Sequence, residues 1–236
     1  MRSVLSQSFG LVSAFLLLSA TSWATEPTNK PEDTPIRKSP RNVAIFVFQG
    51  MELLDFAGPA EVFQAAGPKF NVYTVAQSTE PVVSQRFVKI VPQYSIQNCP
   101  KSDLLVIPGG DTSAPLNSPD VSAWIKQVSE ESEVTISVCT GAFILAKAGL
   151  LDDQPATTHW SQLGRLGKAA PNVQVRSKVR FVDAGKIVTT AGVSAGIDGA
   201  LHVVDRLIGH TAAAFTARGM EYKWDGRREP DDPVSK

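Results

Sequence analysis

Apolar and polar residues alternate in two different patterns along this chain, and the first pattern predicts strands. Short, nearly unbroken apolar runs are typical of strands that a parallel sheet buries on both faces. The strongest runs are Val43–Phe48, Phe70–Ala76, Leu104–Ile107, Val134–Val138 and Ile187–Thr190. Weaker strand patterns cover Val82–Ile96, as a hairpin at the sheet margin, together with Val173–Val175 and Arg180–Val182.

In the second pattern, apolar residues stand three or four positions apart, which predicts helices between the strands. The helical segments are Leu53–Ala66 (interrupted near Gly58-Pro59), Val121–Val128, the residues after Cys139 up to Gly149, Ser161–Leu166 and Ser194–Gly209. Ser194 is a residue type that can cap the last of these helices. Strands and helices in alternation predict an α/β fold, a three-layer αβα sandwich around a mostly parallel, doubly wound sheet.

The first 24 residues have the pattern of a secretory signal peptide rather than of a folded segment. Arg2 gives a positive start, Phe9–Ala20 is a short apolar run, and Ser22–Ala24 fits a cleavage site with small residues. The run is too short to span a bilayer. We therefore expect a secreted protein, periplasmic in a Gram-negative source, with no membrane association after cleavage. The proline-rich segment Thr25–Arg41 is expected to be a disordered leader.

The folded domain is expected at residues 42–224, followed by a polar tail at 225–236. Its composition excludes some classes of function. Basic and acidic residues number 23 each, so no bulk charge favours nucleic acid as a partner. The two cysteines, Cys99 and Cys139, could pair in an oxidising compartment, but the geometry expected around Cys139 disfavours a disulfide. The spacing of histidines and cysteines fits no metal site, and no phosphate or dinucleotide loop is present. We expect no metal and no cofactor.

The strongest chemical signal is the segment around Cys139. A β-branched strand runs directly into this cysteine, and a helical pattern begins just after it. The small residues Ser137 and Gly141 stand two positions to either side, as a sharp strand-to-helix turn requires. This pattern predicts a nucleophile elbow, at which a helix N-terminus favours a thiolate. The alternative is an inert cysteine buried in the core.

Loops that follow neighbouring strands supply partners for this cysteine, because active sites of doubly wound sheets form at the carboxyl ends of the strands. The Thr140 amide with those of Gly109 and Gly110 could form an oxyanion hole. Loop positions also make Gly141, Ser194 and Asp198 candidates for substrate binding.

Titratable candidates come from two further loops. Glu52 and Asp55 follow the first strand, and either carboxyl could move a proton near the thiol, or simply favour the start of a helix. His159 could orient or deprotonate the cysteine, or serve a structural role. His202 and His210 are expected on a helix surface.

Together these segments resemble the ThiJ/PfpI family, a branch of the class I glutamine amidotransferase-like fold. The resemblance extends from Val43 to Trp224 and rests on Phe48–Val62, Asp103–Gly110, Val138–Ala142, Ala156–Trp160 and Ala191–Asp198. The segments look most like the isonitrile hydratase subgroup and the amidase-like domains of AraC-type regulators, although the regulators' helix-turn-helix domain is absent from this sequence.

The resemblance implies that Cys139 is the reactive cysteine and that Asp55 and Thr140 work beside it. Glu52 falls where other members carry a glutamate that hydrogen-bonds the cysteine, so the working carboxyl stays open. Thr140 stands where protease-like members have histidine, which disfavours a proteolytic triad. The resemblance also implies a homodimer that acts on a small-molecule substrate.

Three functions are compatible with this set of residues. The first is an isonitrile hydratase-like reaction at Cys139. The second is a glyoxalase-like conversion of α-oxoaldehydes that uses Cys139 with Glu52 and His159. The third is a non-enzymatic periplasmic binding or redox-sensing module, in which Cys139 is oxidised reversibly. The sequence alone does not choose among them, because a fold does not fix a function.

Overall fold

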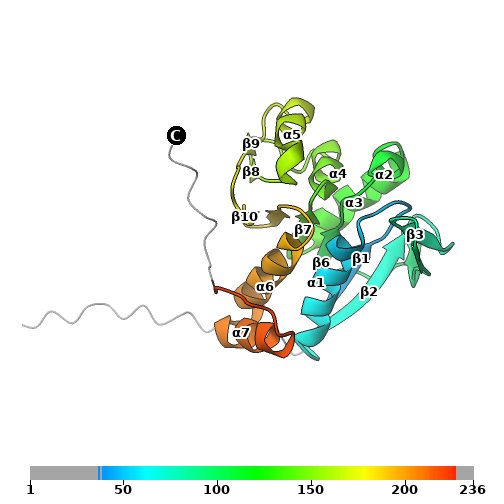
Figure 1. Ribbon diagram of the computed structural model, residues 1–236. Helices are drawn as coiled ribbons and strands as arrows, with labels where there is room; N and C mark the ends of the chain where they lie inside the picture. The colour runs from blue at the N-terminus through cyan, green and yellow to red at the C-terminus, as the bar shows by residue number, and fades with distance from the viewer. Residues whose placement is uncertain (1–36, 38, 227–236) are drawn as a thin grey trace, which may run out of the picture. The chain divides into compact units, whose positions relative to one another are not determined.

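The computed structural model describes residue 37 and residues 39–226 (Figure 1). The expected signal peptide lies outside these residues, as do most of the leader and most of the tail. No helix in the described part of the chain is long and apolar enough to cross a membrane.

A seven-stranded sheet forms the centre of the described domain, in the order β10-β11-β7-β6-β1-β2-β5. All neighbouring strands in it run parallel except β10 and β11. Its strands are β1 (Arg41–Phe46), β2 (Phe70–Ala76), β5 (Tyr94–Ser95), β6 (Leu104–Ile107), β7 (Val134–Val138), β10 (Phe181–Asp183) and β11 (Ile187–Thr190). Two small sheets pair β3 (Val82–Ser84) with β4 (Val88–Ile90) and β8 (Pro155–Ala156) with β9 (Gln174–Val175).

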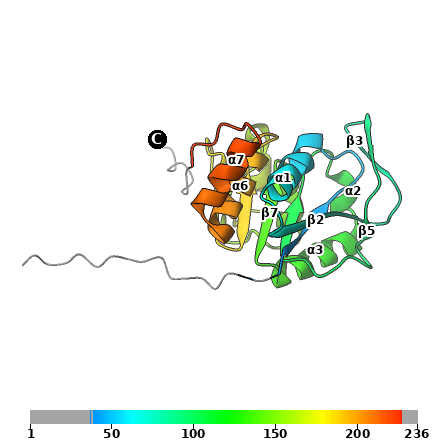
Figure 2. The same ribbon diagram turned by 90° about the horizontal axis from the view of Figure 1, so that it is seen from below.

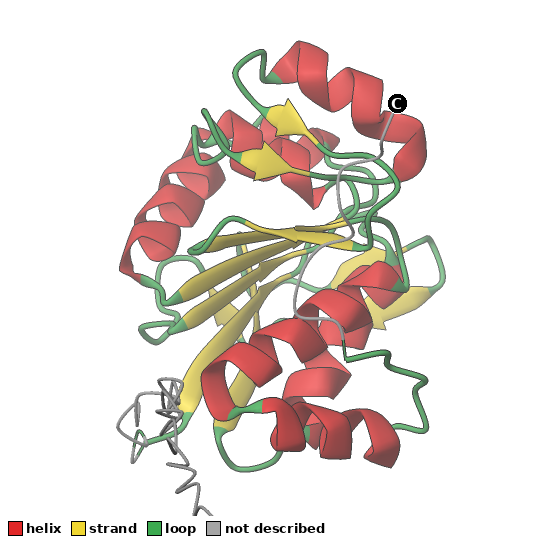
Figure 3. Cartoon of the chain, turned by 90° about the vertical axis from the view of Figure 1, so that its left-hand side faces the viewer, coloured by secondary structure: helices red, strands yellow, loops and turns green. Residues whose placement is uncertain are grey.

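Helices cover the two faces of this sheet. They are α1 (Leu53–Ala65), α2 (Ser113–Leu116), α3 (Pro119–Glu131), α4 (Gly141–Lys147), α5 (Leu163–Ala169), α6 (Ala195–Ile208) and α7 (His210–Gly219), with a 3-10 turn, η1, at Trp160–Gln162. Helices α1, α6 and α7 pack together on one face, and α2, α3 and α4 lie on the other (Figures 2 and 3). The α/β fold with a mostly parallel doubly wound sheet is therefore confirmed.

Buried strands match their predicted ranges well, because fully apolar runs have one stable environment. Strands β2, β6, β7 and β11 have the predicted bounds. The predicted marginal hairpin is split, since β3 and β4 leave the main sheet and β5 alone joins its edge. Helix α7 was not predicted, because its buried face consists of Ala213, Thr216 and Ala217, which give no strong apolar periodicity.

The start of the domain differs from the expected leader. Strand β1 begins at Arg41, and the Arg41 side chain donates to Glu133 at 2.9 Å. Arg37 donates to Asp103 at 2.8 Å and to Glu133 at 2.6 Å. The prediction of a disordered leader up to residue 41 is therefore wrong at its C-terminal end, because these two arginines bind acidic residues that lie next to β6 and β7.

The sheet order also fixes where a site can form. Strands β1 and β6 are neighbours, and the connection after β1 leads to β2 while the connection after β6 leads to β7, in the opposite direction along the sheet. A crevice opens at such a point, at the carboxyl ends of the strands. Asp55 follows β1, Gly109 follows β6 and Cys139 follows β7, so the chain brings these residues to one edge.

Candidate active site

Cys139 occupies a strained turn, as a nucleophile elbow requires. Its φ is 56°, in the left-handed region that non-glycine residues seldom adopt. Its backbone N–H donates to the carbonyl oxygen of Ala191 at 2.9 Å, and its own carbonyl accepts from the Thr158 hydroxyl at 2.7 Å. The strained conformation is thus held from two sides. The side chain is largely buried, with 8% of its surface exposed.

Asp55 is the carboxyl that the fold brings to Cys139. It lies in the first turn of α1 and has no solvent-exposed surface. One carboxylate oxygen accepts from the Gly109 amide at 2.9 Å and the other from the Val193 amide at 3.1 Å. The Cys139 thiol lies beside the same carboxyl, and the two groups influence each other's pKa. Among the residues that the structure describes, no cationic side chain is hydrogen-bonded to this buried carboxyl, whose donors are the two backbone amides.

The electrostatics of this pair disfavour charge on either group. Burial raises the pKa of Asp55 to about 7, and the nearby Glu52 adds to this, although the two amides oppose it. Burial, followed by the Asp55 carboxyl, raises the pKa of the Cys139 thiol to about 12. The raised pKa contradicts the prediction that this position favours a thiolate, because the hydrogen bonds of Thr140 do not outweigh burial and the Asp55 charge.

The backbone amides of Gly109 and Gly110 donate hydrogen bonds within the protein and are not free to bind a substrate. Gly109 donates to Asp55, and Gly110 donates to the Thr140 hydroxyl at 2.9 Å. They do not form the predicted oxyanion hole, and the amide of Thr140 is the candidate donor that points to the sulfur of Cys139. A Cβ at Gly109 would come 2.5 Å from the Thr140 nitrogen, so glycine is required for this close approach. The two glycines position the acid and Thr140 rather than the substrate.

Glu52 and His159 lie near the pair without bonding to the sulfur. Glu52 precedes α1, and its carboxylate accepts from the Gln85 side chain. The His159 ring lies 2.9 Å from the Ser161 hydroxyl and packs against Gly192. Within the described part of the chain, neither side chain is hydrogen-bonded to Cys139.

Gly141, Ser194 and Asp198, predicted to bind substrate, make contacts within the fold. Gly141 begins α4 and lies against the carbonyl oxygen of Ile107, where any side chain would collide. Ser194 does not cap α6 with its side chain and instead accepts from Arg180 at 3.1 Å. Asp198 accepts from Arg180 at 2.7 Å. Ser194 and Asp198 therefore belong to a polar cluster around Arg180.

Some residues of the site carry no signal in the sequence. Val193 contributes through its backbone amide, which no side-chain pattern reveals. Thr158 is part of a quoted motif, but its bond to the carbonyl of Cys139 depends on the fold. His202 was expected at the surface, yet it is 4% exposed, stacks on Phe181 and lies 2.6 Å from Asp183. Helix α6 packs against α1, α7 and the sheet, so positions outside its apolar stripe are buried as well, which explains that error. His210 is exposed as predicted.

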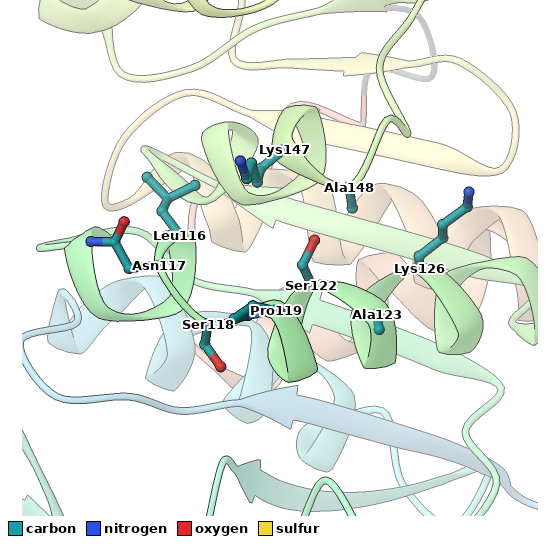
Figure 4. A pocket seen from close by; sticks show the side chains of 9 residues that line it. All are labelled: Leu116, Asn117, Ser118, Pro119, Ser122, Ala123, Lys126, Lys147 and Ala148. Carbon is teal, nitrogen blue, oxygen red and sulfur yellow. The ribbon is translucent and has the colours of Figure 1, made fainter.

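A separate groove of about 600 Å³ lies between α2, α3 and α4 (Figure 4). Its lining residues are Leu116, Asn117, Ser118, Pro119, Ser122, Ala123, Lys126, Lys147 and Ala148. None of them carries a thiol, a carboxyl or an imidazole, and neither Cys139 nor Asp55 is among them. In residues 37 and 39–226, no three His, Cys, Asp or Glu side chains are grouped to hold a metal ion.

Comparison with known proteins shows which family this chain resembles. Residues 41–206 match the model of the DJ-1/PfpI family. Isonitrile hydratase of Pseudomonas putida is 31% identical over 181 residues, which cover 76% of this chain and 78% of that protein. The crystal structure of a ThiJ/PfpI family protein from Pseudomonas syringae has a TM-score of 0.73 and 30% identity, covering 89% of this chain and 85% of that one. The transcriptional regulator GbdR of Pseudomonas aeruginosa is 23% identical over 83% of this chain, which spans 54% of the regulator.

Proposed function

This chain belongs to the DJ-1/PfpI family, and we propose that it is a cofactor-free, cysteine-dependent enzyme that hydrates small molecules of the isonitrile class. The observation that carries the proposal is that the fold places the fully buried Asp55 carboxyl, held by the amides of Gly109 and Val193, beside the Cys139 thiol. A carboxyl with a pKa of about 7 can both accept and return a proton near neutral pH. The 31% identity to an isonitrile hydratase supports the substrate class.

The reaction begins with the thiol, not with a preformed thiolate. As the sulfur attacks the terminal carbon of the isonitrile, the thiol proton passes to Asp55, and Asp55 delivers it to that carbon. The product of this step is a thioimidate bound to Cys139. Because the proton leaves while the new bond forms, the high pKa of the thiol need not be overcome in a separate ionisation.

Water completes the cycle. As a water molecule adds to the thioimidate carbon, Asp55 takes one proton from it and delivers that proton to the nitrogen. Asp55 then takes the remaining hydroxyl proton of the tetrahedral intermediate and passes it to the sulfur as the carbon–sulfur bond breaks, so that an N-substituted formamide leaves and the thiol is restored. The Thr140 amide lies at the sulfur, where it stabilises negative charge as the bond breaks.

The other two functions have less support in the geometry. A glyoxalase-like reaction would use Glu52 and His159, which bond to Gln85 and Ser161 instead of Cys139. Reversible oxidation requires thiolate character, and the raised pKa of Cys139 opposes it.

Turnover of a panel of alkyl and aryl isonitriles tests the proposal, with the formamide detected by mass spectrometry. Cys139→Ala abolishes turnover, and Asp55→Asn lowers kcat/KM by about 10²–10⁴-fold, the range of general acid–base catalysis. Glu52→Gln is the matched carboxyl control and retains turnover. The proposal is wrong if no isonitrile gives Cys139-dependent formamide. Loss of activity in Glu52→Gln alone, with an α-oxoaldehyde as substrate, would instead favour the glyoxalase-like reaction.

We also propose that the enzyme is secreted and acts as a homodimer. The charged start, apolar run and cleavage-site pattern of residues 1–24 support secretion, and the family resemblance supports the dimer. N-terminal sequencing of protein recovered from the periplasm tests the first statement. Light scattering of the purified protein tests the second.

A further inference from the structure

The loop between β11 and α6, residues Ala191–Ser194, contacts both reacting groups. The Ala191 carbonyl accepts from the Cys139 amide at 2.9 Å, and the Val193 amide donates to Asp55 at 3.1 Å. Val193 has φ 53°, a conformation that costs a β-branched residue free energy and that persists only where surrounding contacts impose it.

Arg180 supplies contacts at both ends of this loop. Its backbone carbonyl accepts from the Ala191 amide at 2.9 Å. Its guanidinium donates to the Ser194 hydroxyl at 3.1 Å and to Asp198 at 2.7 Å. Tyr222, beyond the end of α7, donates to the second oxygen of Asp198 at 3.0 Å. A planar guanidinium suits this task, since its donors have a fixed geometry.

We infer that Arg180, Asp198 and Tyr222 form a loop clamp that holds the Val193 amide against Asp55. Arg180 is then a positioning residue for the reaction proposed above, on which this inference rests, and not a catalytic one. Nearly half of its side chain is exposed, at 48%, and its guanidinium donates hydrogen bonds to α6 and to the loop. A residue of the C-terminal segment, Tyr222, is thereby linked to the acid of the site.

If the clamp holds the Val193 amide in place, breaking the clamp should change the pKa of Asp55. The groups that face this carboxyl are the amides of Gly109 and Val193, the thiol of Cys139 and the carboxyl of Glu52. The Val193 amide lowers the pKa of Asp55 against the effect of burial. Releasing that amide therefore raises the pKa further, by about one unit for the loss of one hydrogen bond to a charged group.

A direct titration of Asp55 tests the clamp without any substrate. NMR of isotope-labelled aspartate carboxyl carbons follows the midpoint, and Asp55→Asn identifies the signal. Arg180→Gln is expected to raise the midpoint by about one pH unit. Tyr222→Phe is expected to raise it by less. Because Tyr222→Phe removes no positive charge, a shift in this variant cannot be a simple charge effect.

Arg206→Gln is the matched control, because Arg206 also binds an aspartate beside α6 but does not contact the loop. Its midpoint is expected to equal that of the wild type. A wild-type midpoint in folded Arg180→Gln overturns the inference, and if that variant does not fold, an unchanged midpoint in Tyr222→Phe does so. A shift in a protein that hydrates no isonitrile supports the clamp while refuting the proposed function. Hydration of isonitriles by the wild type, with no change of the Asp55 midpoint in the variants, would support the proposed function and refute the clamp.

Discussion

Asp55 and Asp183 are two largely buried carboxyls of this fold with opposite electrostatics. Burial opposes ionisation of both. For Asp183, hydrogen bonds from His202 and Arg206 outweigh burial and lower the pKa to about 2. Asp55 has amides and a thiol for partners, and its pKa is raised to about 7. A buried acid with a cation beside it is thus a permanent anion, whereas one without a cation becomes a proton carrier at neutral pH.

The largest expected effect comes from neutralising each acid in turn. Asp183→Asn removes one member of a mostly buried ion cluster and lowers the free energy of unfolding by about 2–4 kcal/mol. Asp55→Asn costs less stability, about 1 kcal/mol, because it removes a charge that the site stabilises poorly. Urea unfolding of both variants measures the difference. The isonitrile assay should show the reverse ranking, with activity lost in Asp55→Asn and kept in folded Asp183→Asn. Equal stability losses would contradict the comparison.

Asp55 and Asp183 should also affect the pH dependence of stability in opposite directions. The folded-state pKa of Asp55 is above its unfolded value, so the native state binds the proton more tightly. The free energy of unfolding therefore falls as the pH rises from about 4 to 7, by about 3–4 kcal/mol from this group. Asp183 acts in the opposite sense, since its contribution is present above about pH 4 and is lost as the pH falls towards 2.

Unfolding of wild type and Asp55→Asn across this range isolates the first effect. The difference between the two proteins should change with pH up to neutrality and stay constant above it. A difference independent of pH would show that Asp55 keeps an ordinary pKa in the folded protein.

The smallest expected effect concerns Glu52. Its negative charge contributes to the raised pKa of Asp55, so Glu52→Gln lowers that pKa, by less than about half a unit for a partly exposed neighbour. The acid limb of the pH–rate profile moves to lower pH by the same amount. Glu61→Gln, an exposed site on the same helix, is the control and leaves the profile unchanged. A limb that moves equally in both variants would reflect net charge, not proximity to Asp55.

How far the sequence predicts this molecule depends on the kind of interaction. Apolar runs such as Leu104–Ile107 have one stable environment, so the strands and the elbow at Cys139 could be predicted. The charge state of Cys139 could not, because it depends on burial and on a carboxyl that is distant in sequence. Backbone donors were the least predictable, since the roles of Gly109 and Val193 depend on which acceptor the fold places opposite each amide.

The hydrogen bond from Val193 to Asp55 joins residues 138 positions apart. The closing partner of the site is therefore the last of its components to emerge during synthesis, long after the cysteine itself. Until α6 has docked on α1, the sulfur and the carboxyl lack the surroundings that set their proton affinities. Reactivity of this thiol is consequently a property of the completed domain, and a local opening at α6 would alter it before the central sheet loses a single strand.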